Sequence, residues 1–334
     1  MNLRTLTAER SLLSIFTITL VLLCGVPISA EEKPIWDWDK EEILEKVGRV
    51  RAGKDLTPQS WPDGNRVAVS LSFDVDTEPV WLAFTGQVTP SYMSRGEYGA
   101  RVGLPRILRL LDREGIPATF FVPAATYIIH PSVGKLLRAR PQHEIGFHSH
   151  IHENPLKLSA DEERSVYKKA MEVVVREAGK RPVGFRSAAW DLTESTVEIV
   201  KEMGFLYESS LMADDRPYQL LSEGKDTGLV ELPVEWILDD WPYFQLAWSM
   251  NHHGLRQPDD VYEIWKAEFD EAYEEGTTFI LTMHPQVIGH RHRIRMLRKL
   301  IDYFQTRPGV WFATHEEIAL YVKEQSRRAE GSGE

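Results

Sequence analysis

The sequence of 334 residues contains a single cysteine, Cys24, which lies in an apolar stretch near the start of the chain. The rest of the chain has no thiol, which excludes a disulfide framework, a catalytic cysteine and a cysteine-based zinc site. Any metal bound by this chain must therefore be held by histidine and carboxylate side chains.

Positive charge is also scarce: the chain has 39 Lys and Arg residues but 50 Asp and Glu residues, so its net charge is −11. No block of basic residues stands apart, so we expect no nucleic-acid partner. The G-x-S-x-G, G-x-x-x-x-G-K-[ST] and G-x-G-x-x-G patterns are absent, which removes the usual support for a serine hydrolase, a P-loop enzyme or a dinucleotide enzyme.

Only one long apolar run occurs, at residues 12–26, and it follows Arg4 and Arg10 and precedes a Pro-Ile-Ser-Ala sequence. This pattern predicts a secretory signal peptide over residues 1–30, with cleavage after Ala30 and export to the periplasm or the extracellular space. An uncleaved anchor is the alternative. We expect no other membrane segment.

Residues 31–66 are polar and are predicted to form an N-terminal extension, and residues 324–334 a polar tail. Between them, residues 67–323 alternate short apolar runs with helical periodicity, which predicts an α/β domain with a mostly parallel sheet or barrel. The expected strands are 67–73, 118–122, 144–147, 229–234, 278–283 and 310–312. The expected helices are 103–114, 159–179, 193–203, 259–275, 291–304 and 315–323. In such folds the site lies where strands end.

Two carboxylates end the first of these strands, Asp74 and Asp76. Residues i and i+2 of a strand face the same side, so both carboxylates are expected to converge on one site. A calcium loop is excluded, because its sixth and twelfth positions hold Pro79 and Thr85 instead of Gly and Glu.

Four histidines occur among residues 143–152. The zincin pattern H-E-x-x-H fails, because Phe147 stands where the second histidine is needed. His148 and His152 are four residues apart, so on a helical turn both imidazoles would face one metal. The spacing predicts a metal site, with His150 pointing elsewhere.

His284 follows another apolar strand and is expected to share this site. Arg186 is placed to pair with a catalytic carboxylate, and Asp239 or Asp240 to orient a histidine; surface salt bridges are the alternative. The segment 290–293, His-Arg-His-Arg, is interpreted as a solvated helix start, with contact to a substrate carboxylate as the alternative.

These segments, in this order, resemble the five motifs of the polysaccharide deacetylase family, which is carbohydrate esterase family 4 with its NodB homology domain. The motifs are residues 72–76, 148–152, 186–190, 231–240 and 281–285. The resemblance implies a distorted (β/α) barrel and a divalent metal, usually Zn²⁺, bound by Asp76, His148 and His152. It also implies roles for the remaining residues: Asp74 as general base, His284 as general acid, Arg186 steadying Asp74, and Asp240, with Asp239 as the alternative, orienting His284.

Val75 separates the two aspartates. In this spacing the sequence is similar to a subgroup of peptidoglycan-deacetylase-like and allantoinase-like proteins, whose members tend to be homo-oligomers. The resemblance implies a hydrolase of non-peptide C–N bonds that deacetylates an N-acetylated polysaccharide such as peptidoglycan. Hydrolysis of small cyclic amides or imides is the first alternative, and a non-catalytic glycan-binding protein the second. Four aromatic residues are candidates for either a sugar-stacking rim or the core: Trp190, Trp236, Trp241 and Tyr243.

Overall fold

The computed structural model describes residues 33–84, 86–247 and 252–331. The chain divides into two compact units, Met1–Leu44 and Glu45–Glu334. In the described part of the first unit, the Asp39 side chain accepts a hydrogen bond from the Glu42 backbone and Glu42 accepts one from Asp39. This reciprocal pair caps helix α1 (Lys40–Gly48). The predicted signal peptide and Cys24 lie outside the described residues.

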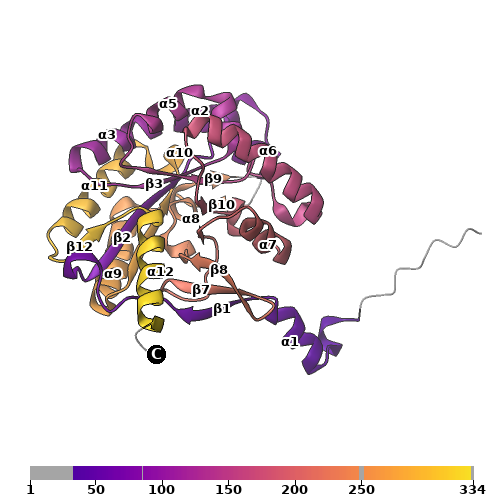
Figure 1. Ribbon diagram of the computed structural model, residues 1–334. Helices are drawn as coiled ribbons and strands as arrows, with labels where there is room; N and C mark the ends of the chain where they lie inside the picture. The colour runs from indigo at the N-terminus through magenta and orange to yellow at the C-terminus, as the bar shows by residue number, and fades with distance from the viewer. Residues whose placement is uncertain (1–32, 85, 248–251, 332–334) are drawn as a thin grey trace, which may run out of the picture. The chain divides into compact units, whose positions relative to one another are not determined.

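The second unit is built on one strongly curled sheet (Figure 1). Its strands run in the order β1-β7-β8-β6-β5-β4-β3-β2-β11, and β12 pairs with β2 as well. Their bounds are β1 Val50–Asp55, β2 Val67–Asp74, β3 Thr119–Val122, β4 Glu144–Phe147, β5 Gly184–Phe185, β6 Tyr207–Glu208, β7 Tyr218–Ser222, β8 Lys225–Glu231, β11 Thr278–Met283 and β12 Val310–Phe312. A separate hairpin joins β9 (Leu246–Ala247) and β10 (His252–His253).

Strand β2 has three parallel neighbours: β3 and β12 at its two ends and β11 along its length. The strands from β11 to β8 are all parallel, so their carboxyl ends meet at one edge. After β8 the chain crosses to β11 and bridges it at Asp239–Thr282. The result is a half-barrel, which confirms the predicted (β/α) barrel class.

Most helices pack around the outside of this sheet, whereas α12 packs on its inner face (Figure 1). Their bounds are α2 Pro90–Tyr98, α3 Leu104–Glu114, α4 Ala124–Ile129, α5 Pro131–Arg138, α6 Ala160–Ala178, α7 Glu194–Glu202, α8 Trp241–Phe244, α9 Pro258–Glu275, α10 Pro285–Ile288, α11 Arg291–Gln305 and α12 His315–Gly331. Short helical turns precede some of them: η1 Ile35–Asp37, η2 Pro62–Gly64, η3 Val80–Phe84, η4 Gly99–Gly103, η5 Pro155–Lys157, η6 Ala188–Trp190 and η7 Trp236–Leu238.

The two faces of β2 differ in chemistry. Val67, Val69, Leu71 and Phe73 join the large apolar core between the sheet and the outer helices. The alternate positions turn inward, where Ala68 belongs to a smaller core with residues of α12, and Ser70, Ser72 and Asp74 are buried polar side chains. The strand therefore carries a polar row inside the barrel that leads to the carboxyl-terminal edge.

The division of the chain differs from the predicted boundaries. Strand β1 lies within the predicted extension of residues 31–66, yet it pairs with β7 and belongs to the sheet. Half of its sequence, Val-Arg-Ala-Gly-Lys-Asp, is charged and most of its residues are exposed, so no apolar pattern marks it. At the other end, α12 continues through Gly331 into the predicted polar tail.

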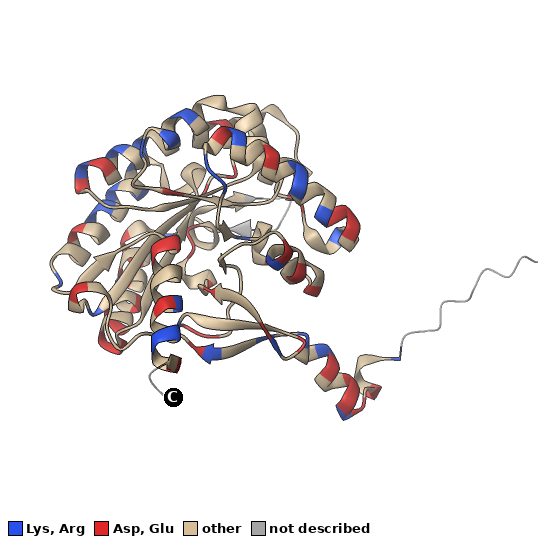
Figure 2. Cartoon of the chain, in the orientation of Figure 1, with Lys and Arg blue, Asp and Glu red and all other residues tan. Residues whose placement is uncertain are grey.

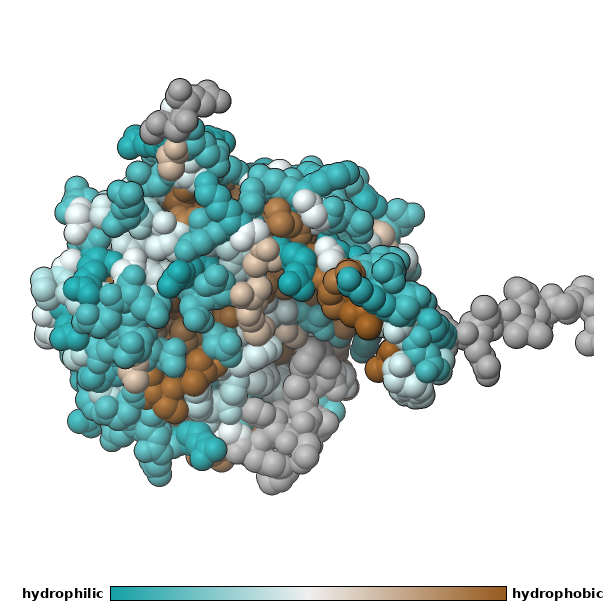
Figure 3. Space-filling view, turned by 90° about the horizontal axis from the view of Figure 1, so that it is seen from below, coloured by the Kyte–Doolittle hydropathy of each residue, from teal (hydrophilic) through white to brown (hydrophobic). Residues whose placement is uncertain are grey.

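The outer surface carries both signs of charge, interspersed over the helices (Figure 2). Seen from below, the surface is mostly hydrophilic and its hydrophobic patches are separate (Figure 3). Among the described residues, none of the helices combines the length and the apolar character needed to cross a bilayer.

Glycines allow the segment from α2 to α3 to lie directly on the backbone of other elements. A Cβ atom on Gly96 would lie 2.4 Å from the Glu78 backbone nitrogen, and one on Gly103 would lie 2.0 Å from the Pro285 carbonyl oxygen. Pro285 follows His284, so the position of this predicted catalytic residue depends on the close approach at Gly103.

We predict that Gly103→Ala lowers the free energy of unfolding by about 1–3 kcal/mol, because the backbone of Pro285 must move. The same displacement of His284 should lower kcat. Thermal unfolding and steady-state kinetics measure both effects. Gly48→Ala is the control, because a Cβ there meets no atom within 4 Å; equal behaviour of the two variants would contradict the prediction.

Candidate active site

The predicted site residues meet at the carboxyl-terminal edge of the half-barrel, where several of them line a cavity of about 270 Å³. They come from the ends of five elements. Asp74 and Asp76 lie at the end of β2, His148 and His152 in the loop after β4, Arg186 at the end of β5, Asp239 and Asp240 in the turn after η7, and His284 at the end of β11. Asp74, Asp76, His152, Asp239 and His284 line the cavity itself.

Asp76 lies among three imidazoles. Its Oδ1 is 3.4 Å from Nε2 of His148, and its Oδ2 is 3.6 Å from Nε2 of His152 and 3.6 Å from Nε2 of His284. Asp76, His148 and His152 each offer a ligand atom, and these atoms lie within 4.8 Å of one another. The structure thus brings together the three residues that were predicted to hold a metal.

The buried groups around Asp76 fit a cation. Neither carboxylate oxygen of Asp76 accepts a hydrogen bond from a described residue, although the side chain is 1% exposed. Nδ1 of His148 donates to the Arg186 carbonyl at 2.8 Å, which directs the Nε2 lone pair at Asp76. A lone pair and a carboxylate repel each other unless a cation lies between them, so the donor set suits a divalent metal.

The carboxylates of this cluster attract positive charge: burial opposes the charged form of His148, but Asp74 and Asp76 raise its pKa above the usual value. Burial opposes the ionised form of Asp76, but His152, His148 and His284 outweigh it and lower the pKa of Asp76 below its usual value. Burial also lowers the pKa of His152, which favours the neutral imidazole that a metal needs.

The loop that carries the two histidines is not the helical turn expected from their spacing. Ser149 and His152 have φ angles of 62° and 61°, in the left-handed region that ordinary side chains rarely adopt. The Glu153 carboxylate accepts hydrogen bonds from the backbone of His150 and Ile151 and holds this conformation. Strain of this kind is often found at functional sites.

Arg186 is fully buried and joins Asp74 to the polar interior of the barrel. Its Nη1 donates to Asp74 Oδ1 and to Ser72 Oγ, both at 2.9 Å, and its Nη2 lies 3.2 Å from Nε2 of His315. Nδ1 of His315 is 2.8 Å from Ser70 Oγ. Burial and the neighbouring Arg186 lower the pKa of His315 well below its usual value, so its neutral ring accepts from the guanidinium.

On the opposite side of the cavity, His284 is paired with Asp240. Its Nδ1 is 2.7 Å from Asp240 Oδ1, and its backbone N–H donates to Asp240 Oδ2 at 3.0 Å. Asp239 is farther from Nδ1, at 3.6 Å, and its Oδ1 accepts from the Trp241 backbone. The geometry thus selects Asp240 as the partner of His284.

Burial opposes the positive charge of His284, but Asp239 and Asp240 raise its pKa well above the usual value. Burial, together with the charge of Asp240, raises the pKa of Asp239 to about 8 despite the opposing effect of His284. Asp240 lies closer to Nδ1 of His284 than Asp239 does, so it is the carboxylate that holds the cationic imidazole in place.

Aromatic side chains form the walls of the cavity. Trp190, Trp236 and Trp241 line it, the first two with ring centroids 4.3 Å apart, and Trp241 meets His284 edge-on at 5.3 Å. Trp236 is 43% exposed. Tyr243 does not line the cavity; its hydroxyl donates to the Ile237 carbonyl.

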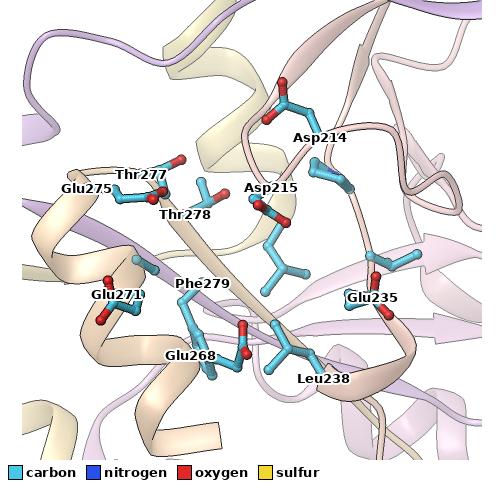
Figure 4. Close-up of a pocket in the computed structure, with 14 residues that line it drawn as sticks. Asp214, Asp215, Glu235, Leu238, Glu268, Glu271, Glu275, Thr277, Thr278 and Phe279 are labelled. Carbon is cyan, nitrogen blue, oxygen red and sulfur yellow. The ribbon is translucent and has the colours of Figure 1, made fainter.

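Another cavity, of about 110 Å³, lies on the side of β11 and η7 and contains none of the predicted site residues. Carboxylates surround it (Figure 4): Asp214, Asp215, Glu235, Glu268, Glu271 and Glu275. Burial and the nearby Asp215, Glu235 and Glu271 raise the pKa of Glu268. Like charges crowd this cavity, and no histidine lines it.

Comparison with known proteins identifies the class. The family model for polysaccharide deacetylases matches residues 95–207, which include His148, His152 and Arg186. A curated peptidoglycan deacetylase of Helicobacter pylori is 31% identical over 279 residues, which cover 76% of this chain and 95% of that protein.

Solved structures agree. A candidate polysaccharide deacetylase from Mycobacterium smegmatis superposes with a TM-score of 0.75 at 36% identity, covering 83% of this chain and 96% of that one. The PuuE allantoinase superposes with a TM-score of 0.68 at 26% identity, covering 80% and 92%. The chain belongs to the polysaccharide deacetylase family, whose deacetylases are hydrolases of non-peptide carbon–nitrogen bonds.

We predict that the protein binds one divalent metal per chain and that His148→Ala loses it, because two ligands leave too few donors. Metal analysis after dialysis against Zn²⁺ measures the content. His150→Ala, in the same loop as His148 but outside the cluster, should keep the metal. Full metal content in His148→Ala would place the metal elsewhere.

Proposed function

We propose that this chain is a Zn²⁺-dependent hydrolase that removes acetyl groups from an N-acetylated glycan, with peptidoglycan as the leading substrate. The observation that carries the proposal is the buried Asp76 carboxylate, which accepts no hydrogen bond from a described residue and faces His148 and His152. Asp74 and His284 flank this cluster in one cavity, as an acid–base pair must.

Asp76, His148 and His152 would hold a divalent metal, which would supply Lewis-acid polarisation of the amide carbonyl and a lower pKa for the attacking water. Asp74 then takes a proton from that water. Arg186 compensates the charge of Asp74 Oδ1 and leaves Oδ2, which is 3.9 Å from Nε2 of His148, beside the ligand cluster. Asp74 is thus held in place as the general base.

His284 acts on the other side of the scissile bond. Asp240 holds Nδ1, so Nε2 of His284 carries the proton that faces the cavity. Transfer of this proton to the amide nitrogen lets the nitrogen leave as an amine. Trp241 packs on the imidazole and limits the water that reaches it.

The glycan substrate is supported by the likeness to the H. pylori peptidoglycan deacetylase over almost its whole length. The exposed Trp236 and its neighbour Trp190 offer aromatic faces at the cavity for a sugar ring. The direct test is acetate release from N-acetylated peptidoglycan fragments by Zn²⁺-loaded protein, with and without EDTA. Release that EDTA abolishes supports the proposal. Fragment binding without release would instead indicate a glycan-binding protein.

A second candidate is hydrolysis of a small cyclic amide or imide, which the likeness to the PuuE allantoinase favours. The same metal, base and acid serve either substrate. Ring opening of cyclic imides by a protein that leaves the glycan fragments intact would select this candidate.

We also propose that the chain is exported, because residues 1–30 have the signal-peptide pattern and a cell-wall glycan lies outside the cytoplasm. N-terminal sequencing of protein recovered from outside the cytoplasm should begin at Glu31. Recovery in the cytoplasm alone would contradict export.

We predict that Asp74→Asn keeps the metal but lowers kcat about 10²–10⁴-fold, because an amide cannot accept the proton from water. Metal analysis and kinetics on the same preparation separate the two effects. Unchanged turnover would show that Asp74 is not the base.

We predict that Asp240→Asn moves the alkaline limb of the kcat profile to lower pH. His284 acts in its protonated form, and the negative charge of Asp240 raises its pKa. Removing that charge lowers the pKa, so His284 loses its proton earlier as the pH rises. Kinetics across the pH range measure the limb. If the alkaline limb does not move, the limb reports the titration of a group other than His284, and the prediction is wrong.

A further inference from the structure

A third cavity, of about 300 Å³, shares no lining residue with the catalytic cavity. It is bounded by α2, the segment from α8 to β9, α10 and the start of α11. Its lining residues are Ser94, Arg95, Tyr98, Phe244, Gln245, Leu246, Leu255, Gln286, His290 and Arg293. We call it the arginine pocket.

Positive charge in the arginine pocket is only partly compensated by acidic groups. Neither Arg95 nor Arg293 forms an ion pair within 4.0 Å among the described residues, and the acidic side chain that acts on Arg293 is Asp240, from a longer distance. Arg95 donates to the Leu246 carbonyl at 2.6 Å and to the Gln245 side chain, and Arg293 donates to the Val287 and Phe244 carbonyls at 3.0 and 3.1 Å. Both guanidinium groups are therefore oriented by neutral acceptors.

Polar groups in the arginine pocket are also left without partners. Gln286 is 4% exposed, and neither its Oε1 nor its Nε2 has a hydrogen-bond partner among the described residues. Nε of Arg293 is buried and unpartnered in the same way. A buried amide without a partner is costly, so these groups point to a ligand that satisfies them.

We propose that the arginine pocket binds a small carboxylate that carries a short hydrocarbon chain. The carboxylate accepts hydrogen bonds from Gln286 Nε2 and Arg293 Nε and compensates the two arginines. The hydrocarbon part lies against Phe244, Leu246 and Leu255, which make up the apolar side of the pocket. A volume near 300 Å³ suits a small organic anion.

The arginine pocket lies close in the chain to the proposed general acid, although the proposal of carboxylate binding does not rest on the proposed reaction. Gln286 and His284 are separated only by Pro285, and Arg293 donates to the backbone of α10. A ligand in the arginine pocket therefore contacts the short helix that begins directly after the proposed general acid.

Calorimetric titration of the full chain with propionate tests the proposal, with inorganic phosphate as the second probe and NaCl holding the ionic strength constant. We expect saturable binding of one propionate per chain, and at least tenfold weaker binding of phosphate. Asp76→Ala should bind propionate equally well, because the catalytic cavity is separate. Loss of binding in Asp76→Ala would assign the anion to the metal centre and overturn the proposal.

Two variants address the pocket itself. Gln286→Met removes the unpartnered amide with a side chain of similar length, so it should fold and still weaken propionate binding at least tenfold. Arg293→Gln should do the same, whereas Arg295→Gln, an exposed arginine of the same helix, should bind like the unmodified chain. Unchanged binding in both pocket variants, phosphate binding without propionate binding, or no saturable binding would overturn the proposal.

Discussion

The negative charge of Asp76 is the constraint on which the rest of the site depends. A carboxylate that is 1% exposed and accepts no hydrogen bond from a described residue is expensive to bury without compensation. Here three imidazoles surround it, and two of them, with Asp76, form a group able to bind a metal. The bound cation of the proposed function offsets this cost, and metal binding and the order of the surrounding loops are therefore coupled.

The interior of the barrel explains how the base and the acid are held on either side of that charge. On the inward face of β2, Ser70, Ser72 and Asp74 form a polar row, and His315 and Arg186 span it. On the other side, the bridge between Asp239 and Thr282 sets Asp240 against both the backbone and the ring of His284. One parallel sheet thereby holds both groups through buried hydrogen bonds, and the loops above it are left free to determine the substrate.

Much of the site could be predicted from the sequence because its residues follow apolar strands. Asp74, Asp76 and His284 end clear runs of buried side chains, and the fold places those ends together. The choice between Asp239 and Asp240 could not be made, because it depends on how the chain turns after η7. His315 was missed because a lone histidine at a helix start gives no signal; its importance arises only when β12 pairs with β2. Strand β1 was missed because its side chains are mostly exposed, and the histidine loop was misjudged because positive φ angles leave no mark on spacing.

The most direct test of this account is the location of the metal in crystals of the Zn²⁺-loaded protein, from anomalous difference density measured on both sides of the zinc absorption edge. The account predicts a peak bounded by Asp76, His148 and His152. The cluster of Asp239, Asp240 and His284 is the other group of described residues whose ligand atoms lie close enough to bind a metal. A peak there, or no peak at Asp76 in crystals that contain zinc, would contradict the assignment of the metal site and of His284 as the acid.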